Sequence, residues 1–204
     1  IANRRAPIAK KIYQELGGSS PILPLTEEQA SALELKLNKD DGLSKYKCFI
    51  VMRCWHPRAK NVVKEVINYN PNEVILMPLY PQYSAATSGS SIKEWNSICK
   101  KNNFKVKTSI ICCYPTDDNF IQAHKDEIMK KTHNLENYKL IFSAHGLPEK
   151  NIKKGDPYQW QVEQSVDKIV NSLNIKNLDW ILSYQSRVGP LKWIGPSTED
   201  IIVE

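Results

Sequence analysis

The residue best suited to proton chemistry in this chain is His145, which lies in the stretch 138–148. Residues 140–142 form a short apolar run, which is typical of a strand buried on both faces. Gly146 and Pro148 then break the strand. Ligands of open α/β sheets meet the carboxyl ends of the strands, and a histidine there can exchange protons near neutral pH. A loop histidine without a role has the same local sequence, so the rest of the chain must decide.

A second stretch with chemical potential is the hydroxyl-rich loop 81–91. It leads into a helical pattern marked by Ile92, Trp95 and Ile98. Free N–H groups and the helix dipole favour an anion at such a helix N-terminus. The loop lacks the Gly-Lys-Ser/Thr of a P-loop, so we do not predict a nucleotide.

The elements that must position these residues alternate between helices and strands. Helical spacing predicts helices over 7–16, 26–37, 57–67, 92–99, 120–128 and 157–173, the second opening with the capping box Thr26-Glu-Glu-Gln29. Apolar runs predict strands over 48–52, 74–79, 106–112, 140–143 and 180–184. This order indicates an α/β fold with parallel sheets and right-handed crossovers. We expect an N-terminal α/β unit over 1–115, a C-terminal α/β unit over 116–204, and a cleft at their carboxyl strand ends.

Composition and charge narrow the partners. The 204 residues are 41% apolar and 25% charged, which allows a packed core. The net charge of +6 suits nucleic acid, an acidic membrane surface or a carboxylate-bearing small molecule. The basic residues are scattered and no nucleic-acid-binding motif accompanies them, so we expect no nucleic-acid partner. Five cysteines without a C-x-x-C pair indicate a reducing compartment, and with no leader or membrane-spanning run we expect a cytoplasmic protein.

Nine short motifs in register cover nearly the whole chain. They are Arg4-Arg5-Ala-Pro7, Gly17-Gly-Ser-Ser-Pro21, Met52-Arg-Cys-Trp-His-Pro57, Leu79-Tyr-Pro-Gln-Tyr-Ser84, Thr87-Ser-Gly-Ser-Ser91, Phe142-Ser-Ala-His-Gly-Leu-Pro148, Gly155-Asp-Pro-Tyr158, Tyr184-Gln-Ser-Arg-Val-Gly-Pro190 and Trp193-Ile-Gly-Pro-Ser-Thr198. Together they resemble ferrochelatase, the family that inserts ferrous iron into protoporphyrin IX to form protoheme in the last step of heme biosynthesis. The resemblance implies a chelatase-like fold of two Rossmann-like units that face one another across a cleft.

The resemblance also bears on the ends of the chain and on cofactors. The family begins with a strand and a glycine-containing loop ahead of Ile1, and continues past Glu204 into a His-x-Glu-Thr-Leu segment. We therefore expect a fragment that lacks both flanks. The cysteines that hold an iron–sulfur cluster in some members lie partly in the missing C-terminal region. We expect no cluster here, and no cofactor beyond the substrate Fe²⁺.

The site residues divide between chemistry and substrate binding. His145 is the predicted catalytic base and metal contact, because a neutral imidazole accepts protons and a site with few ligands releases its metal to the porphyrin. Tyr83 and Trp193, with Leu191, are predicted walls for the flat macrocycle. The resemblance adds substrate-binding residues, namely Arg5 and Arg53 on the polar side, Ser88 at a propionate and Tyr13 in the lining. For Asp156 we favour helix capping over a place on the family's metal path.

Other interpretations stay open at this point. One is a cobalt chelatase for another tetrapyrrole, although the Gln-Ser-Arg-Val-Gly-Pro and Pro-Gln-Tyr-Ser motifs favour the iron enzyme. Another is a catalytically incomplete porphyrin-binding remnant, and a third is an interaction domain without a ligand. We also consider peripheral membrane contact, because the product is greasy, and self-association, because unpaired sheet edges invite it.

Overall fold

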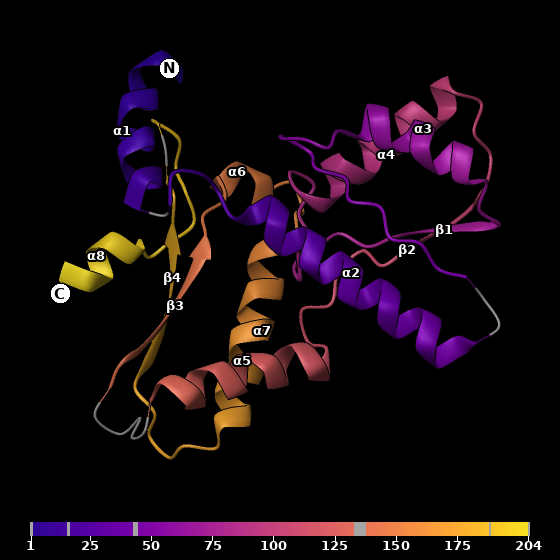
Figure 1. Cartoon of the computed structure of the whole chain (residues 1–204). Coiled ribbons are helices and arrows are strands. Elements are labelled where there is room, and N and C mark those ends of the chain that lie inside the picture. Colours follow the sequence, from indigo (N-terminus) through magenta and orange to yellow (C-terminus); the bar gives the residue numbers. More distant parts are fainter. Residues whose placement is uncertain (1, 16, 43–44, 133–137, 188, 204) are drawn as a thin grey trace. The chain divides into compact units, whose positions relative to one another are not determined.

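The computed structural model describes residues 2–15, 17–42, 45–132, 138–187 and 189–203, and for residues 2–5, 8, 40 and 41 it describes the backbone alone. The chain divides into two compact units, residues 1–70 and 71–204, which are treated separately here (Figure 1). The unit boundary expected from the sequence, between residues 115 and 116, falls between the two sheets described below and stays a prediction.

The described part of the first unit contains three helices and an extended segment. The helices are α1 (Ala2–Glu15), α2 (Ile22–Asp41) and α3 (Ala59–Tyr69). On α3, Val62, Val63 and Val66 are buried at helical spacing and form the apolar face. Asn70 takes a left-handed conformation, and its amide donates to the carbonyls of Val66 and Ile67, which ends the helix.

Two expectations for this unit are wrong. Residues 45–51 form no strand, and Met52 makes only an isolated bridge to Arg58. The physical reason is that α2 side chains bond this backbone, since Glu34 Oε2 accepts from the amide of Cys48 at 2.7 Å. The capping box fails because α2 begins a turn earlier, and Thr26 instead donates to the carbonyl of Ile22 within the helix.

The second unit opens with a small parallel sheet. Strand β1 (Glu73–Leu76) pairs with β2 (Lys107–Ile110), and α4 (Ser88–Lys101) connects them. Trp95 is the buried large side chain of α4. This is the βαβ arrangement that the alternating pattern predicts.

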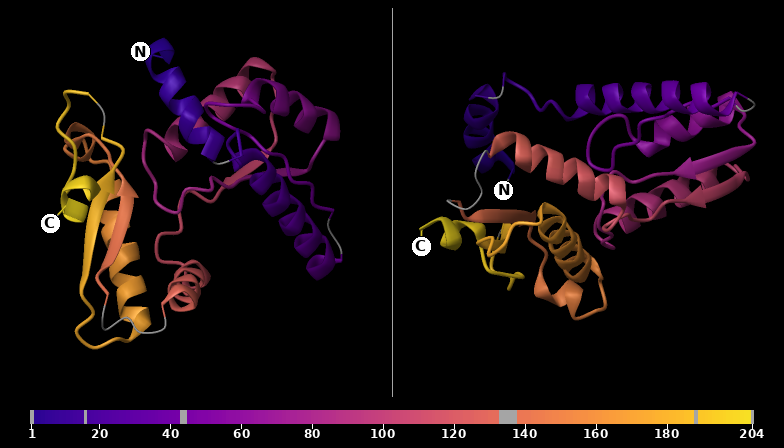
Figure 2. Two further views of the ribbon diagram at one scale, coloured as in Figure 1. Left: turned by 60° about the vertical axis from the view of Figure 1, so that its left-hand side comes forward. Right: turned by 90° about the horizontal axis from the view of Figure 1, so that it is seen from below.

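A second parallel sheet carries the core. Strand β3 (Leu140–His145) pairs in register with β4 (Trp180–Gln185). Between them lie α6 (Glu149–Ile152) and α7 (Tyr158–Leu173), while α5 (Asp118–Lys131) precedes β3 and α8 (Thr198–Val203) follows β4. Figures 1 and 2 show α7 along one face of this sheet. The core cluster joins α7, β4 and the two loops beside it through Leu147, Val162, Val166, Tyr184 and Ile194.

One expectation for β3 is also wrong. The strand is buried on one face, because its residues alternate between half-buried and exposed, and Ile141 is 37% exposed. The core packs against the face that carries Phe142 and Ala144. β3 therefore follows the alternation of a strand with one open face.

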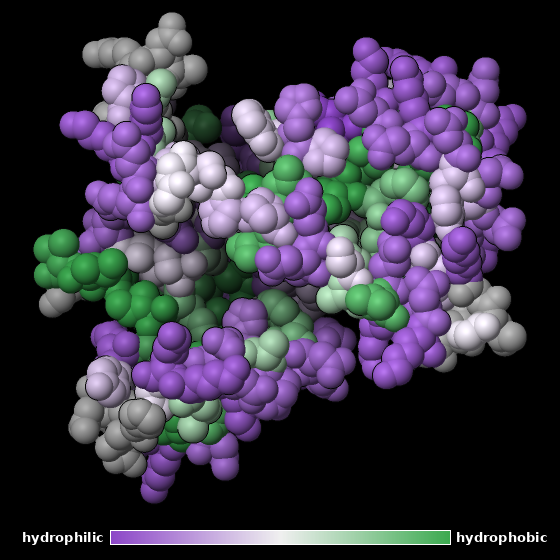
Figure 3. Space-filling view, viewed as in Figure 1, coloured by the Kyte–Doolittle hydropathy of each residue, from purple (hydrophilic) through white to green (hydrophobic). Residues whose placement is uncertain are grey.

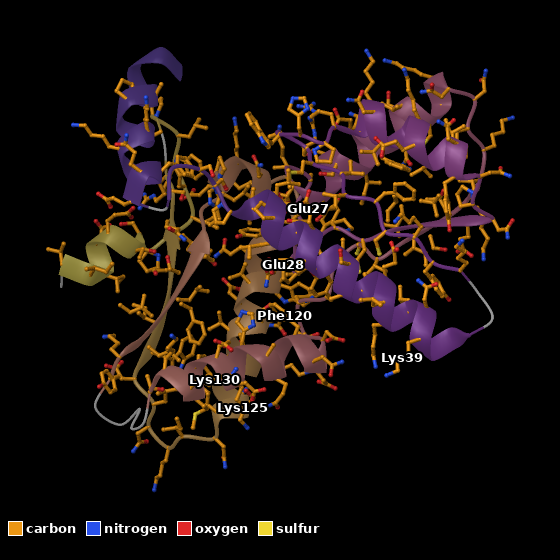
Figure 4. All side chains as sticks on the ribbon, in the orientation of Figure 1. Glu27, Glu28, Lys39, Phe120, Lys125 and Lys130 are labelled. Atoms are coloured by element: carbon orange, nitrogen blue, oxygen red, sulfur yellow. The ribbon has the colours of Figure 1, made fainter. Side chains whose placement is uncertain are left out.

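Charged and apolar groups mark the surface of the second unit. Lys125 and Lys130 project from α5 (Figure 4). The exposed end of α8 is hydrophobic (Figure 3), in agreement with side chains of Ile202 and Val203 that are 69% and 88% exposed. Among the helices of the described part of the chain, none is both long and apolar enough to cross a membrane.

Candidate functional site

His145 is the last residue of β3, where it stands opposite Gln185 of β4. It is exposed, so its imidazole is open to solvent and to a ligand. Its main chain is held on both sides. The amide of Gly146 donates to the carbonyl of Gln185 at 2.7 Å, and the hydroxyl of Tyr158 donates to the carbonyl of His145 at 2.9 Å. The carboxyl ends of both parallel strands thus present the candidate base.

Trp193 lies against the residue that follows His145. A Cβ atom on Gly146 would come within 3.2 Å of Cε3 of Trp193 and within 2.9 Å of the carbonyl oxygen of Gln185. The Trp193 loop is fixed there by a bridge to Pro148. This part of the site therefore needs glycine at 146, because any larger residue would displace the indole or the backbone of β4. Trp193 therefore packs against Gly146, the residue that follows His145.

Beside Trp193 the surface is hollowed. The cavity measures about 320 Å³ and is lined by Arg187, Gly189, Leu191, Trp193, Ser197 and Glu199. Apolar side chains and one charge of each sign thus share the hollow. It includes Leu191, which the sequence predicts as a wall residue. Arg187 and Glu199 were not predicted as site residues. The only sequence signal for Arg187 was the motif 184–190 that contains it, and the only one for Glu199 was the motif 193–198 that precedes it.

Tyr83 is positioned by α7 and by α4. Its amide donates to Oε1 of Gln161 on α7 at 2.7 Å. Its ring packs on Gly89, where a Cβ would come within 2.6 Å of the Tyr83 hydroxyl oxygen. The neighbouring Ser84 hydroxyl and Ala85 amide both donate to Oδ2 of Asp156, at 2.8 and 2.9 Å. The loop that carries Tyr83 is therefore fastened to the start of α7.

Asp156 makes two sets of hydrogen bonds, and the sequence predicts one of them. Its Oδ1 accepts from the amide of Tyr158 at 3.1 Å, which agrees with the capping interpretation. Its Oδ2 holds the Tyr83 loop, and this role was missed. Gln161 and Ser165 were missed as well, although their polar side chains are buried beside the apolar stripe of α7. That contrast was the available signal, because buried polar groups are normally hydrogen-bonded.

Ser88 begins α4 and is fully buried. Its hydroxyl oxygen makes no hydrogen bond within the part of the chain that the structure describes, and the same holds for Nε1 of Trp193. Both predicted site residues thus carry a polar atom without a partner in this part. Burying such an atom costs free energy that a hydrogen bond from a ligand would recover.

Of two tyrosines near this site, Tyr158 is half-buried and Tyr184 is buried. Burial raises the pKa of Tyr158. Burial also raises the pKa of Tyr184, and the negative charge of Glu163 adds to this effect. Both hydroxyls therefore remain protonated at neutral pH, so Tyr158 remains a hydrogen-bond donor.

The other predicted residues belong to the first unit. Tyr13 on α1 is 42% exposed, and Arg53 is exposed after the extended segment. The side chain of Arg5 lies outside the described residues. Across the described chain, no three His, Cys, Asp or Glu side chains come together as a metal-binding group.

Comparison with known proteins decides the family. The family model described as Ferrochelatase matches residues 1–204. The chain belongs to the ferrochelatase family. It is 78% identical over its whole length to a ferrochelatase of Pelagibacter ubique (strain HTCC1062), covering 59% of that protein. It is 48% identical over 98% of its length to a ferrochelatase of Wolbachia sp. subsp. Drosophila simulans (strain wRi), covering 64% of that protein.

The fold comparison agrees with this membership. SirB from Bacillus subtilis with Fe³⁺ is similar over 87% of this chain and 65% of its own, with a TM-score of 0.57 and 15% identity. At that identity the likeness shows the fold alone. Together with the ferrochelatase family model, it confirms the predicted α/β chelatase-like fold. The chain spans about three fifths of the length of its curated relatives, so activity and substrates are taken up below as proposals.

Proposed function

We propose that this chain forms part of a ferrochelatase, which inserts ferrous iron into protoporphyrin IX and yields protoheme. The observation that carries the proposal is the pairing of an exposed histidine with an aromatic wall. His145 ends β3 in the open, and the indole of Trp193 lies against the adjoining Gly146. Membership of the ferrochelatase family supports the reaction assigned to this site.

The chemistry requires a base and a ligand that releases its metal. Insertion of Fe²⁺ replaces two pyrrole N–H protons, so two protons must leave the macrocycle. A neutral imidazole at His145 accepts them one at a time and passes them to solvent, to which it is exposed. The same imidazole is our proposed contact for the incoming Fe²⁺. A single histidine holds a metal more weakly than a three- or four-ligand cage, which favours transfer to the porphyrin nitrogens.

Binding of the macrocycle needs apolar walls and polar anchors. We assign Tyr83, Leu191 and Trp193 to the walls, since the first and last are held by hydrogen bonds of their loops and Leu191 lines the hollow beside Trp193. Ser88, which is buried at the start of α4, is proposed as a propionate contact on the family resemblance alone.

The remaining assignments rest on the family resemblance. Arg5, Arg53 and Tyr13 stay proposed substrate-binding residues, the two arginines for polar contacts and Tyr13 for the lining. That the chain needs no cofactor besides the substrate Fe²⁺, and no iron–sulfur cluster, stays a prediction. Cytoplasmic location, peripheral membrane contact and self-association also stay predictions. Exposed apolar residues such as Ile110 on β2 and Ile202 on α8 are candidate contact points for either association.

The test combines porphyrin binding with anaerobic metal insertion by the purified 204-residue chain. A saturable shift of the porphyrin absorption, followed by formation of the metalloporphyrin from Fe²⁺, is the expected result. Saturable binding without insertion by this chain, while the full-length Pelagibacter ubique relative inserts iron, would indicate a porphyrin-binding remnant. The absence of any shift would favour an interaction domain, and insertion of Co²⁺ in place of Fe²⁺ would favour the cobalt enzyme.

A further inference from the structure

Two adjacent thiols lie outside the site described above. Cys112 and Cys113 follow β2, and their sulfur atoms are 2.7 Å apart. Both are free; Cys112 is exposed and Cys113 is half-buried. The two sulfur atoms are thus already in contact with one another.

The surroundings hold the pair in place. Nε2 of Gln161, a buried residue of α7, donates to the sulfur of Cys113 at 3.7 Å. The next amide along the chain, that of Tyr114, donates to the carbonyl of Pro81 at 2.8 Å. The half-buried sulfur is therefore fixed against α7, while the sulfur of Cys112 is open to small solutes.

The other three cysteines differ from this pair. Cys48 and Cys54 belong to the first unit, and Cys99 is half-buried on α4. Within the described residues, none of these three sulfurs has another sulfur in hydrogen-bond contact, whereas Cys112 and Cys113 have each other. A reversible two-thiol reaction can therefore start from the observed geometry only at 112–113.

We propose that Cys112 and Cys113 form a two-electron redox site, which a peroxide oxidant converts into a disulfide between the two adjacent residues. The thiolate of Cys112 attacks the O–O bond of hydrogen peroxide, which gives a sulfenic acid on Cys112 and hydroxide, and the hydroxide takes up the thiol proton as water. The sulfur of Cys113 then displaces the sulfenic hydroxyl, which leaves with the Cys113 proton as a second water. In sum, two thiols and one peroxide yield one disulfide and two waters.

The exposure of Cys112 determines which thiol the oxidant reaches first and makes the disulfide accessible to reduction. The oxidant meets Cys112 first because it is the exposed member, and Cys113 resolves the sulfenic acid because it is already in contact. An external thiol reverses the reaction, since an exposed disulfide is open to thiolate attack. The hydrogen-bond contact with Cys113 and burial raise the pKa of Cys112. The attacking thiolate is therefore scarce at neutral pH, and the rate of oxidation rises as the pH rises toward that raised pKa.

The test is peptide mass analysis of the intact 204-residue chain after treatment with hydrogen peroxide and blocking of the remaining thiols. Both cysteines fall in the tryptic peptide 108–125, which contains no other cysteine. We expect this peptide to lose two hydrogen atoms, to escape blocking, and to regain both thiols with dithiothreitol. The matched variant Cys54→Ser retains this behaviour.

The variant Cys112→Ser separates the proposal from general oxidation. It leaves Cys113 without a neighbouring thiol. Peptide 108–125 then gains oxygen or forms a mixed disulfide with an external thiol, and it does not lose two hydrogen atoms. Circular dichroism checks that the variant is folded. The proposal is overturned if the unmodified chain acquires only sulfinic or sulfonic acid at Cys112, or if Cys112 and Cys113 remain free thiols while Cys54 is oxidised. Neither readout depends on metal insertion, so failure of the proposed function would leave this test intact.

Discussion

The hydroxyl of Tyr158, the first residue of α7, donates a 2.9 Å hydrogen bond to the carbonyl oxygen of His145, the last residue of β3. Burial raises the pKa of Tyr158, which keeps the donor protonated at neutral pH. The main chain of the proposed base is therefore positioned by a side chain that belongs to α7. Tyr158 is a positioning residue in this account, because it acts on the substrate only through His145.

Replacement of Tyr158 by phenylalanine tests this relationship. The variant keeps the ring and loses the donor, so we expect the free energy of unfolding to fall by about 1 kcal/mol. In a metal-insertion assay kcat should fall several-fold while the KM for porphyrin changes little, because the base shifts and the walls do not. Urea unfolding and steady-state kinetics measure the two effects. An unchanged kcat would remove the positioning role.

Gly146→Ala tests the close approach of Trp193 to the end of β3. The new Cβ would lie 2.9 Å from the carbonyl oxygen of Gln185, so backbone must move, and we expect a loss of about 1–3 kcal/mol in unfolding free energy. Gly195→Ala is the matched control, because its Cβ would meet only the amide of Ser197, at 3.9 Å. Equal unfolding free energies for the two variants would contradict the packing described here.

Asp156→Asn tests the attachment of the Tyr83 loop. The carboxylate accepts from the Ser84 hydroxyl and the Ala85 amide through one oxygen, and an asparagine cannot serve these donors and the Tyr158 amide together as well as a carboxylate does. We expect a loss of about 1–2 kcal/mol and faster hydrogen exchange at the Ala85 amide. Asp126→Asn on α5 removes the charge of an exposed side chain whose described hydrogen bond is to its own helix neighbour Gln122, and should leave that exchange unchanged.

Glu34 gives the first unit a defined dependence on pH. The hydrogen bond from the Cys48 amide, with Lys47 beside it, holds the pKa of Glu34 below its usual value of 4.5. A carboxyl group with a depressed pKa in the folded state stabilises that state above its unfolded pKa. This contribution is lost as the pH falls through the folded pKa.

Glu34→Gln should therefore lower the free energy of unfolding by about 1 kcal/mol near pH 7 and by much less near pH 3. Urea unfolding at the two pH values measures the difference. Glu28, an exposed residue of α2 that Figure 4 labels, provides the control Glu28→Gln. We expect this variant to change the free energy of unfolding by less than about 0.5 kcal/mol at either pH value. A loss that is the same at both pH values would contradict the charge-based account.

Local patterns predicted the parts of the fold that local physics determines. The apolar run 140–142 and the breakers after it placed His145 at the carboxyl end of a strand, where the structure has it. The alternation of strands and helices predicted parallel sheets, and both sheets that the structure describes, β1–β2 and β3–β4, are parallel. The prediction that β3 is buried on both faces was wrong, because an apolar run does not show whether a second layer covers the strand.

The missed features depend on partners distant in the sequence. The segment 45–51 has strand-like composition, yet side chains of Glu34 and Asn38 on α2 accept hydrogen bonds from its amides. The apolar pattern of the segment does not show that these side chains take the place of a partner strand. Gln161 reaches the amide of Tyr83 across 78 positions of the chain, and Asp156 reaches Ser84 across 72. Such tertiary hydrogen bonds can be identified only in the folded structure. A polar residue beside the apolar stripe of a helix nevertheless indicates a position where one is expected.

The most direct test of the account is anaerobic insertion of Fe²⁺ into protoporphyrin IX by the chain and by His145→Ala. His124→Ala is the matched control, since His124 is an exposed histidine that contacts Phe120, one turn earlier on its own helix. The account predicts that the chain and His124→Ala form protoheme, and that His145→Ala binds the porphyrin and leaves it unmetallated. Formation of protoheme by His145→Ala at the rate of the unmodified chain would contradict it.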